Sequence, residues 1–224
     1  MQFILTTGWE DGIASLAERL VHELAAGKRV VWLVCGGSNI PAGVAIMSSI
    51  SPNLSKGLAV TLTDERYGEV GHKDSNWTQL MNAGFKANQA KLLPVLQPGL
   101  SLKQTVARYD QMITTVFGVA DCIIAQFGIG EDGHIAGILP GSVAAGEQKA
   151  MAVGYKSDPF TRLTISFPAI RQLSAAYAFA FGDTKRQALT TLEQKKLVLT
   201  KQPAQILKQL DEAYVYNDQV GRQT

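Results

Sequence analysis

The sequence predicts an α/β fold: a three-layer α/β/α sandwich built around a mostly parallel, Rossmann-like sheet. Two observations support this class. Short apolar runs with the composition of strands alternate along the chain with longer segments of helical periodicity. Some runs, such as 30–35 (VVWLVC) and 122–127 (CIIAQF), are continuously apolar, which is typical of parallel strands covered by helices on both faces. The length of 224 residues suits one domain, and we expect residues 1–224 to form it.

The predicted strands are apolar or alternating runs bounded by turn residues. They are expected at 2–7, 30–35, 58–63, 92–96, 122–127, 150–155, 162–167, 175–181 and 213–216. The first and the last are short, and we expect both at edges of the sheet.

The predicted helices are segments with apolar residues three and four positions apart. They are expected at 10–26, 41–50, 76–81, 101–117, from 182–185 to about 193, and at 203–210. In the first of these, Gly27 follows the apolar stripe and ends the helix. Ser75 is a natural N-cap, and Pro41 and Pro203 suit the first position of a helix.

Composition and charge exclude several classes of protein. The hydrophobic fraction is 46% and the charged fraction 18%, as in globular proteins, and the net charge of +2 with no run of Lys or Arg argues against nucleic-acid binding. The start, MQFILTTGWEDG, has neither the basic n-region nor the cleavable apolar core of a signal peptide, and no apolar run approaches the roughly 18 residues of a membrane span. We therefore expect a cytoplasmic protein without a membrane partner.

Cysteine and histidine spacing predicts neither disulfides nor metal binding. Cys35 and Cys122 border predicted buried strands, where a reduced thiol behaves as a small apolar residue, and they form no CxxC motif. His22 and His72 have no ligand-like spacing to His134. We expect no metal and no cofactor.

The stretch 121–142 carries the densest chemistry in the chain. Gly128, Gly130 and Gly133 follow the apolar run 122–127, so the backbone can turn sharply where the strand ends. Asp132 and His134 lie among these glycines. A histidine beside an aspartate is also common as a surface or capping arrangement. In an open α/β sheet, however, ligands bind at the carboxyl ends of the strands, which favours a functional site here.

A second glycine-rich loop follows the strand 30–35. Gly36, Gly37 and Ser38 stand between that strand and the helix that Pro41 begins. Exposed N–H groups and the helix dipole make such a loop a site for an anion. The same residues also suit an ordinary connection between a strand and a helix, so both interpretations remain open.

These segments resemble a known family. GIGEDGHIA at 128–136, followed by Pro140 and Gly141, is similar to the GxGxDGHxA…PG signature shared by 6-phosphogluconolactonases and glucosamine-6-phosphate deaminases. The loop 36–41, the DER…H…SN arrangement within 64–76, RxTxxxPxI at 162–170 and GxxK at 182–185 match the same family. The resemblance covers nearly the whole chain and implies the fold of lactonases and sugar-phosphate isomerases. The sequence departs from the usual pattern at Pro41, which stands one residue late, at Gly68 and Glu69, and at Gly137.

The resemblance implies roles for individual residues. His134 would act as the base that activates water and then return the proton, because imidazole titrates near neutrality. Asp132 would hold the imidazole in the productive tautomer, and Asp64 is placed with the catalytic residues. The expected substrate- and phosphate-binding residues are Gly36, Gly37, Ser38, Arg66, Ser75, Asn76, Gly130, Arg162 and Lys185.

The function expected from this set is metal-independent hydrolysis of 6-phospho-D-glucono-1,5-lactone. The rival is a glucosamine-6-phosphate deaminase, but such enzymes typically have tyrosine where this chain has Arg66 and Asn76, and a glutamate where it has Leu139. A third hypothesis is a non-catalytic sugar-phosphate sensor, which should lack the acid–base pair and carry a reader domain for which 224 residues leave no room. The expected partner is a small sugar phosphate, and the chain is expected to be a monomer or a small homo-oligomer.

Overall fold

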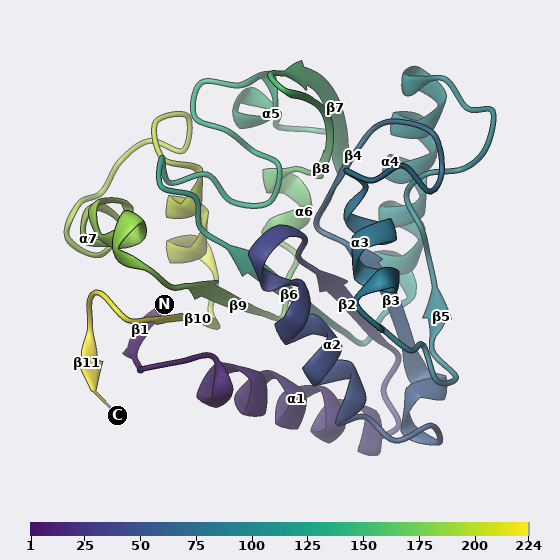
Figure 1. The fold of residues 1–224 in the computed structure, drawn as a ribbon, viewed down its shortest axis with the longest axis horizontal. Helices are drawn as coiled ribbons and strands as arrows, with labels where there is room; N and C mark the ends of the chain where they lie inside the picture. The colour runs from purple at the N-terminus through teal and green to yellow at the C-terminus, as the bar shows by residue number, and fades with distance from the viewer. Residues whose placement is uncertain (224) are drawn as a thin grey trace.

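The computed structural model describes residues 1–223 and confirms the α/β class. Within these residues, eight parallel strands form the main sheet in the order β11-β1-β10-β9-β6-β2-β3-β5 (Figure 1). Their bounds are β1 Gln2–Leu5, β2 Val30–Val34, β3 Leu58–Leu62, β5 Lys91–Leu92, β6 Cys122–Gly128, β9 Ala175–Ala180, β10 Ala213–Asn217 and β11 Arg222–Gln223. All neighbouring pairs are parallel.

The edges of this sheet differ from the prediction. The strand β10 lies between β9 and β1, and β1 pairs on its other side with β11. Neither is therefore an edge strand, because partners far apart in the sequence cover both. The strand expected at 92–96 is only Lys91–Leu92, and it forms the opposite edge beside β3.

Three further strands form a separate antiparallel sheet. These are β4 Asp64–Arg66, β7 Ala152–Ser157 and β8 Phe160–Ile165, in the order β4-β8-β7. The strands predicted at 150–155 and 162–167 thus exist but pair outside the main sheet. The three residues of β4, which a sequence pattern would place in a solvated loop, bring the second sheet next to the end of β3. This sheet stands above the main sheet in Figure 1.

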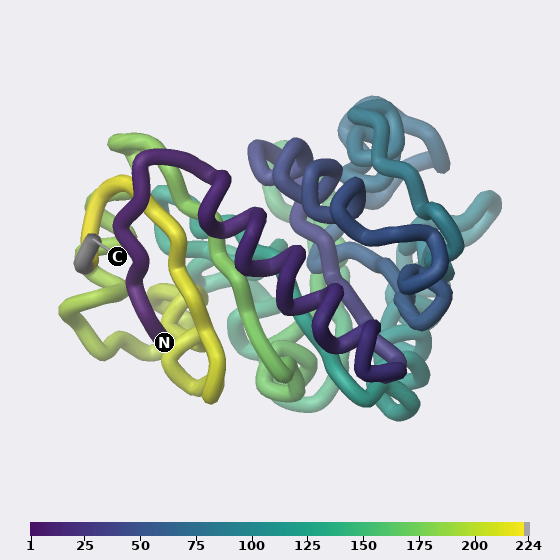
Figure 2. The backbone as a smooth tube through the Cα atoms, turned by 90° about the horizontal axis from the view of Figure 1, so that it is seen from below, coloured from purple at the N-terminus to yellow at the C-terminus, as the bar shows by residue number. Residues whose placement is uncertain are grey.

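Helices cover the main sheet. Their bounds are α1 Glu10–Ala25, α2 Ile40–Ser48, α3 Asn76–Asn82, α4 Leu102–Val119, α5 Val143–Gly146, α6 Phe167–Ile170 and α7 Arg186–Gln194, with 3₁₀ turns at Gly37–Asn39, Leu54–Gly57, Asp183–Lys185 and Pro203–Gln209. The helices α1 and α2 pack side by side along one face, as Figures 1 and 2 show. The last predicted helix, 203–210, is a 3₁₀ segment rather than an α-helix.

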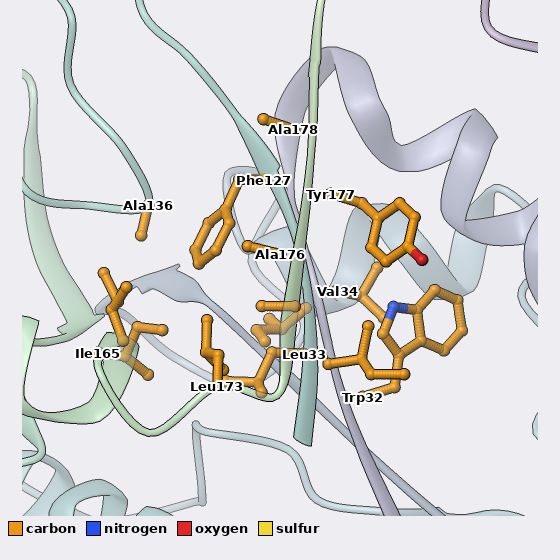
Figure 3. Packing of buried hydrophobic residues seen from close by; sticks show 14 of the residues in the cluster. Trp32, Leu33, Val34, Phe127, Ala136, Ile165, Leu173, Ala176, Tyr177 and Ala178 are labelled. Carbon is orange, nitrogen blue, oxygen red and sulfur yellow. The ribbon is translucent and has the colours of Figure 1, made fainter. Parts of the chain in front are cut away.

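The core lies on both faces of β2, as the continuously apolar run predicted. Every residue of β2 is buried. Figure 3 shows Trp32 and Val34 on one side of the strands, while Leu33 lies on the other side with Phe127 of β6. This alternation is the period of two that a strand imposes, and it explains why no polar residue interrupts the run.

The strand order creates a crevice. From β2 the chain continues to β3 and β5 on one side and then returns through α4 to β6 on the other side of β2. The segments that leave the carboxyl ends of β2 and β6 consequently diverge, and an open α/β sheet binds ligands at such a switch point.

Candidate active site

One cleft gathers nearly all of the predicted site residues. It opens at the carboxyl ends of β2, β3, β6 and β9. The predicted residues that line it are Gly36, Gly37, Ser38, Asp64, Arg66, Asn76, Gly130, His134, Arg162 and Lys185. Asp132 and Ser75 are not among its lining residues. The parallel sheet thus brings together groups that are as much as 149 positions apart (36 to 185) in the sequence.

The carboxylate of Asp132 orients the imidazole of His134 through the ring atom Nδ1. The imidazole Nδ1 is 2.7 Å from Asp132 Oδ1, and the backbone N–H of His134 donates to the same oxygen at 3.0 Å. A carboxylate at Nδ1 favours the tautomer in which Nδ1 carries the proton and Nε2 is free to accept one. Burial alone would raise the pKa of Asp132, but the hydrogen bonds from His134 outweigh it, and the net pKa is below the usual value. Asp132 therefore stays an anion beside the imidazole.

The imidazole of His134 packs directly against the backbone of Gly130. A Cβ at this position would overlap His134 Nδ1 and would lie 2.6 Å from Asp132 Oδ1. The backbone of the loop is closed by hydrogen bonds from Gly130 N to His134 O and from Gly133 N to Gly130 O, both 2.9 Å. Only a residue without a side chain allows the His134–Asp132 pair to pack onto the turn.

Asp64 is a nearly buried carboxylate in the cleft, 5% exposed. The amide of Asn76 donates to Asp64 O at 2.9 Å and lies 3.3 Å from Asp64 Oδ2, and the Thr63 hydroxyl lies 3.3 Å from Asp64 Oδ1. The same amide packs onto Gly36, where a Cβ would overlap it. Asn76 therefore joins the end of β3 to the loop after β2 and fixes the orientation of the Asp64 carboxylate.

Ser75 has a structural position instead of the predicted place in the cleft. It is 1% exposed, caps α3 by accepting from Thr78 N at 3.1 Å, and donates to Glu65 Oε2 at 2.9 Å. Glu65 is fully buried and also accepts from the backbone N–H of Arg66, Asn76 and Trp77. Burial raises the pKa of Glu65, and these hydrogen bonds oppose that effect. The predicted capping role of Ser75 is confirmed, whereas a direct contact with a ligand in the cleft does not fit its position.

Two arginines lie opposite each other on neighbouring strands of the second sheet. Arg66 of β4 pairs with Arg162 of β8, and their guanidinium carbons lie 5.0 and 5.7 Å from the centre of the Phe160 ring. Neither forms a salt bridge within residues 1–223. Arg66 donates to Asp74 O at 3.0 Å and Arg162 to Ser157 Oγ at 2.9 Å. Like charges directly opposite each other in a sheet destabilise it, so this pair favours an anion between or beside the two groups.

Lys185 adds a third cation to the cleft. It ends the 3₁₀ turn Asp183–Lys185 after β9 and directly precedes α7. Across the cleft entrance, the loop of Gly36, Gly37 and Ser38 leads through a 3₁₀ turn into the N-terminus of α2. Three cations and a helix N-terminus give the cleft an environment suited to a phosphate dianion.

Several lining residues were not predicted from the sequence. Asn39 directly follows the Gly36 loop and is 3% exposed, and its amide donates to the carbonyl oxygens of Phe127 and Phe179 at 3.3 Å each. It thereby ties together the ends of β6 and β9, a role that its position after a glycine-rich loop could have suggested. Trp9 and Phe181 also line the cleft, and no local pattern links them.

Cys35 lines the cleft but cannot supply a nucleophile near neutral pH. Burial, together with the charge of Asp64, raises the pKa of its thiol to about 12. The thiolate, which is the reactive form, is therefore scarce. Within the part of the chain that the structure describes, no group of three or more His, Cys, Asp and Glu side chains converges as metal ligands would. In the same residues no helix is both long and apolar enough to cross a bilayer.

Part of the chain is similar in sequence to a characterised enzyme. A 6-phosphogluconolactonase of Xylella fastidiosa strain 9a5c is 31% identical over 137 residues, which cover 60% of this chain and 56% of that protein. The aligned part thus spans little more than half of the relative's length.

Solved structures show the same fold. The crystal structure of a 6-phosphogluconolactonase from Shewanella baltica OS155 matches with a TM-score of 0.80 and 21% identity over 97% of both chains. A monomeric glucosamine-6-phosphate deaminase matches with a TM-score of 0.79 and 19% identity, also over 97% of both chains. At these identities the likeness concerns the fold alone, and the fold is shared by enzymes of both kinds. The sequence model of the glucosamine-6-phosphate isomerases and 6-phosphogluconolactonases, however, matches residues 9–216, and the chain therefore belongs to this family.

Proposed function

We propose that this protein hydrolyses 6-phospho-D-glucono-1,5-lactone to 6-phosphogluconate, a step of the oxidative pentose phosphate pathway, without a metal ion. Membership of the family supports a sugar phosphate as the substrate. The relative from Xylella fastidiosa is a 6-phosphogluconolactonase. The observation that carries the proposal is the combination, in one cleft, of an oriented imidazole with three cations.

The cations bind the phosphate. Arg66 and Arg162 can both donate to phosphate oxygens, and guanidinium groups match that geometry well. Lys185 and the N–H groups of the loop 36–38 supply further donors from the other strand ends. Holding the phosphate in this way places the lactone end of the substrate in the cleft beside His134, which lowers the entropic part of the barrier.

His134 then moves the protons of the reaction. Nε2 accepts a proton from a water molecule while the water oxygen forms a bond to the lactone carbonyl carbon, C1. The carbonyl oxygen becomes an oxyanion in the tetrahedral intermediate. When the tetrahedral intermediate collapses, the bond between C1 and the ring oxygen breaks, and His134 returns the proton to that oxygen. The Asp132 carboxylate stabilises the imidazolium between the two steps.

Asp64 has a supporting part in this scheme. Its carboxylate lines the cleft in an orientation that Asn76 and Thr63 fix. An ionised carboxylate is purely an acceptor, so it can bind a hydroxyl group of the sugar or the attacking water.

The residues after His134 argue against the deaminase alternative. The Tyr155 hydroxyl donates to Gly137 O at 2.6 Å and accepts from Leu139 N at 3.3 Å, which fixes this segment to the second sheet. Leu139 does not line the cleft, and its side chain has no group that could relay a proton. The oriented His134–Asp132 pair also gives a catalytic role more support than a sensor role.

A direct comparison of two substrates tests the proposal. Purified protein treated with a chelator is offered 6-phosphogluconolactone and, separately, glucosamine 6-phosphate. Lactone hydrolysis is followed against its spontaneous background, and ammonia release is measured by a coupled assay. We expect rapid lactone hydrolysis and no ammonia. Ammonia release without lactone hydrolysis would favour the deaminase, and binding of both sugars without turnover would favour the sensor.

A further inference from the structure

We propose that Trp9, together with Phe181, forms an apolar wall of the cleft against which the carbon skeleton of the sugar phosphate packs, so that Trp9 helps to select a sugar over other phosphates. This inference rests on the proposed function and adds a specificity-determining residue to it. The phosphate-binding groups described above would hold any phosphorylated compound equally well. Selection of a sugar therefore needs a second contact, with the part of the substrate that is not phosphate.

The geometry of the aromatic cluster points to this wall. The Trp9 ring stacks on Phe181 with centroids 5.5 Å apart and an interplanar angle of 17°, and on Phe179 at 6.3 Å and 13°. Phe179 lies near the end of β9 and Phe181 directly follows the strand, and both rings stack against the indole. The indole therefore lies over both rings, at the point where β9 enters the cleft.

The aromatic cluster of Trp9, Phe179 and Phe181 is only partly buried. Phe179 is 2% exposed, whereas Trp9 and Phe181 retain partial exposure, and all three line the cleft. Trp9 directly precedes α1, and its carbonyl oxygen accepts from Ile13 N at 2.8 Å, which fixes its backbone. An aromatic surface held in place by stacking and by a helix start binds a ligand with little loss of conformational entropy.

The aromatic wall also lies in the same cleft as the phosphate-binding residues. Lys185 stands four residues after Phe181, on the turn that follows β9. Lys185, Trp9 and Phe181 line the same cleft, so a ligand whose phosphate binds Lys185 can contact the aromatic wall. The C–H groups of a sugar form apolar patches between its hydroxyl groups, and a flat aromatic ring covers such a patch. Inorganic phosphate has no C–H groups and gains nothing from the wall.

Trp9→Ala tests the proposal when two probes are compared. Dissociation constants for 6-phosphogluconate and for inorganic phosphate are measured by titration calorimetry. We expect the variant to bind 6-phosphogluconate about three- to tenfold more weakly, the usual worth of one aromatic contact, and phosphate as before. Trp77→Ala is the matched control: it removes the same side chain from α3, where Trp77 is partly exposed outside the cleft, and both constants should stay unchanged.

Other outcomes contradict the proposal. Equal weakening of both probes would mean that Trp9 supports the general shape of the cleft, and unchanged binding of both would mean that it makes no contact. If Trp9→Ala does not fold, the chain's three tryptophans provide a second measurement. With Trp32 and Trp77 replaced by Phe, 6-phosphogluconate should change the emission of Trp9 and phosphate should not; no change with the sugar would overturn the proposal. Failure of the unmodified protein to bind or hydrolyse its sugar phosphate would instead reject the proposed function.

Discussion

Replacing Gly130 with Ala should lower kcat by roughly 10²-fold without unfolding the protein. The Cβ of the alanine would overlap His134 Nδ1 and approach Asp132 Oδ1 to 2.6 Å. The backbone of Gly130 does not have the left-handed conformation that requires glycine, so the chain accepts an alanine there. The strain therefore falls on the side chains of His134 and Asp132. These are 34% and 49% exposed, respectively, and can move outward.

The size of the effect follows from the overlap. Ordinary contact begins at 3.4 Å, so the Asp132 oxygen must retreat by about 0.8 Å (3.4 − 2.6), and the imidazole must move as well. Misplacement of a reacting group by about 1 Å can cost roughly 10²-fold in rate, which sets the expected fall in kcat. Stability should change little, because an alanine lowers the entropy of the unfolded chain and stabilises by about 0.4–1 kcal/mol, which offsets the displaced hydrogen bond.

The assay is steady-state lactone hydrolysis combined with urea unfolding of the same variant. Gly118→Ala in α4 is the matched control, since a Cβ there meets nothing within 4 Å and Gly118 does not line the cleft. The control should keep full activity and gain a little stability. If Gly130→Ala keeps kcat within threefold of the unmodified protein, the position of the His134–Asp132 pair does not limit the reaction.

Other predictions concern charge and phosphate binding. Because the hydrogen bonds from His134 lower the pKa of Asp132, a carbon-13 NMR titration of His134→Asn should show a higher Asp132 pKa, and an unchanged value would refute that cause. A lowered folded-state pKa stabilises the protein above the usual range of aspartate, and this contribution is lost as the pH falls through the folded-state value. Arg66→Met and Arg162→Met should each raise KM with little change in kcat, because a phosphate contact is made equally in ground and transition states; a fall in kcat alone would place that arginine at the reacting end. Phe160→Leu should raise KM by a smaller factor, about two- to fivefold, since it removes the ring on which both guanidinium groups rest, and an unchanged KM would show that the ring does not position them.

The parts of the fold that the sequence predicted are those governed by local patterns. The continuously apolar runs of β2 and β6, the stripe of α1 and the Ser75 cap all depend on residues within a few positions of one another. The glycine-rich loops were predicted at the carboxyl ends of β2 and β6 for the same reason. Their convergence on one cleft required only the rule that parallel strands end at the same edge.

The parts that the sequence could not predict depend on distant partners. The pairing of β4 with β8 joins residues about 100 positions apart, and it turns the polar tripeptide Asp64–Arg66 into a strand with a buried Glu65. The insertion of β10 between β9 and β1 likewise depends on neighbours that no local pattern reveals. The contact between Trp9 and Phe181 spans 172 positions (181 − 9) and became visible only when the sheet was assembled. Ser75 and Asn76 were both expected in the site because they match one motif of the family; Asn76 lines the cleft, whereas Ser75 does not.

We infer that His134 is the base of a lactone hydrolase, and the activity of His134→Asn tests this claim most directly. Asparagine keeps a similar size and some hydrogen-bonding capacity but cannot accept a proton near neutral pH. With folding verified by circular dichroism and urea unfolding, kcat for 6-phosphogluconolactone should fall by about 10²–10⁴, the usual worth of a general base. A folded His134→Asn variant that hydrolyses the lactone at the rate of the unmodified protein would contradict the claim.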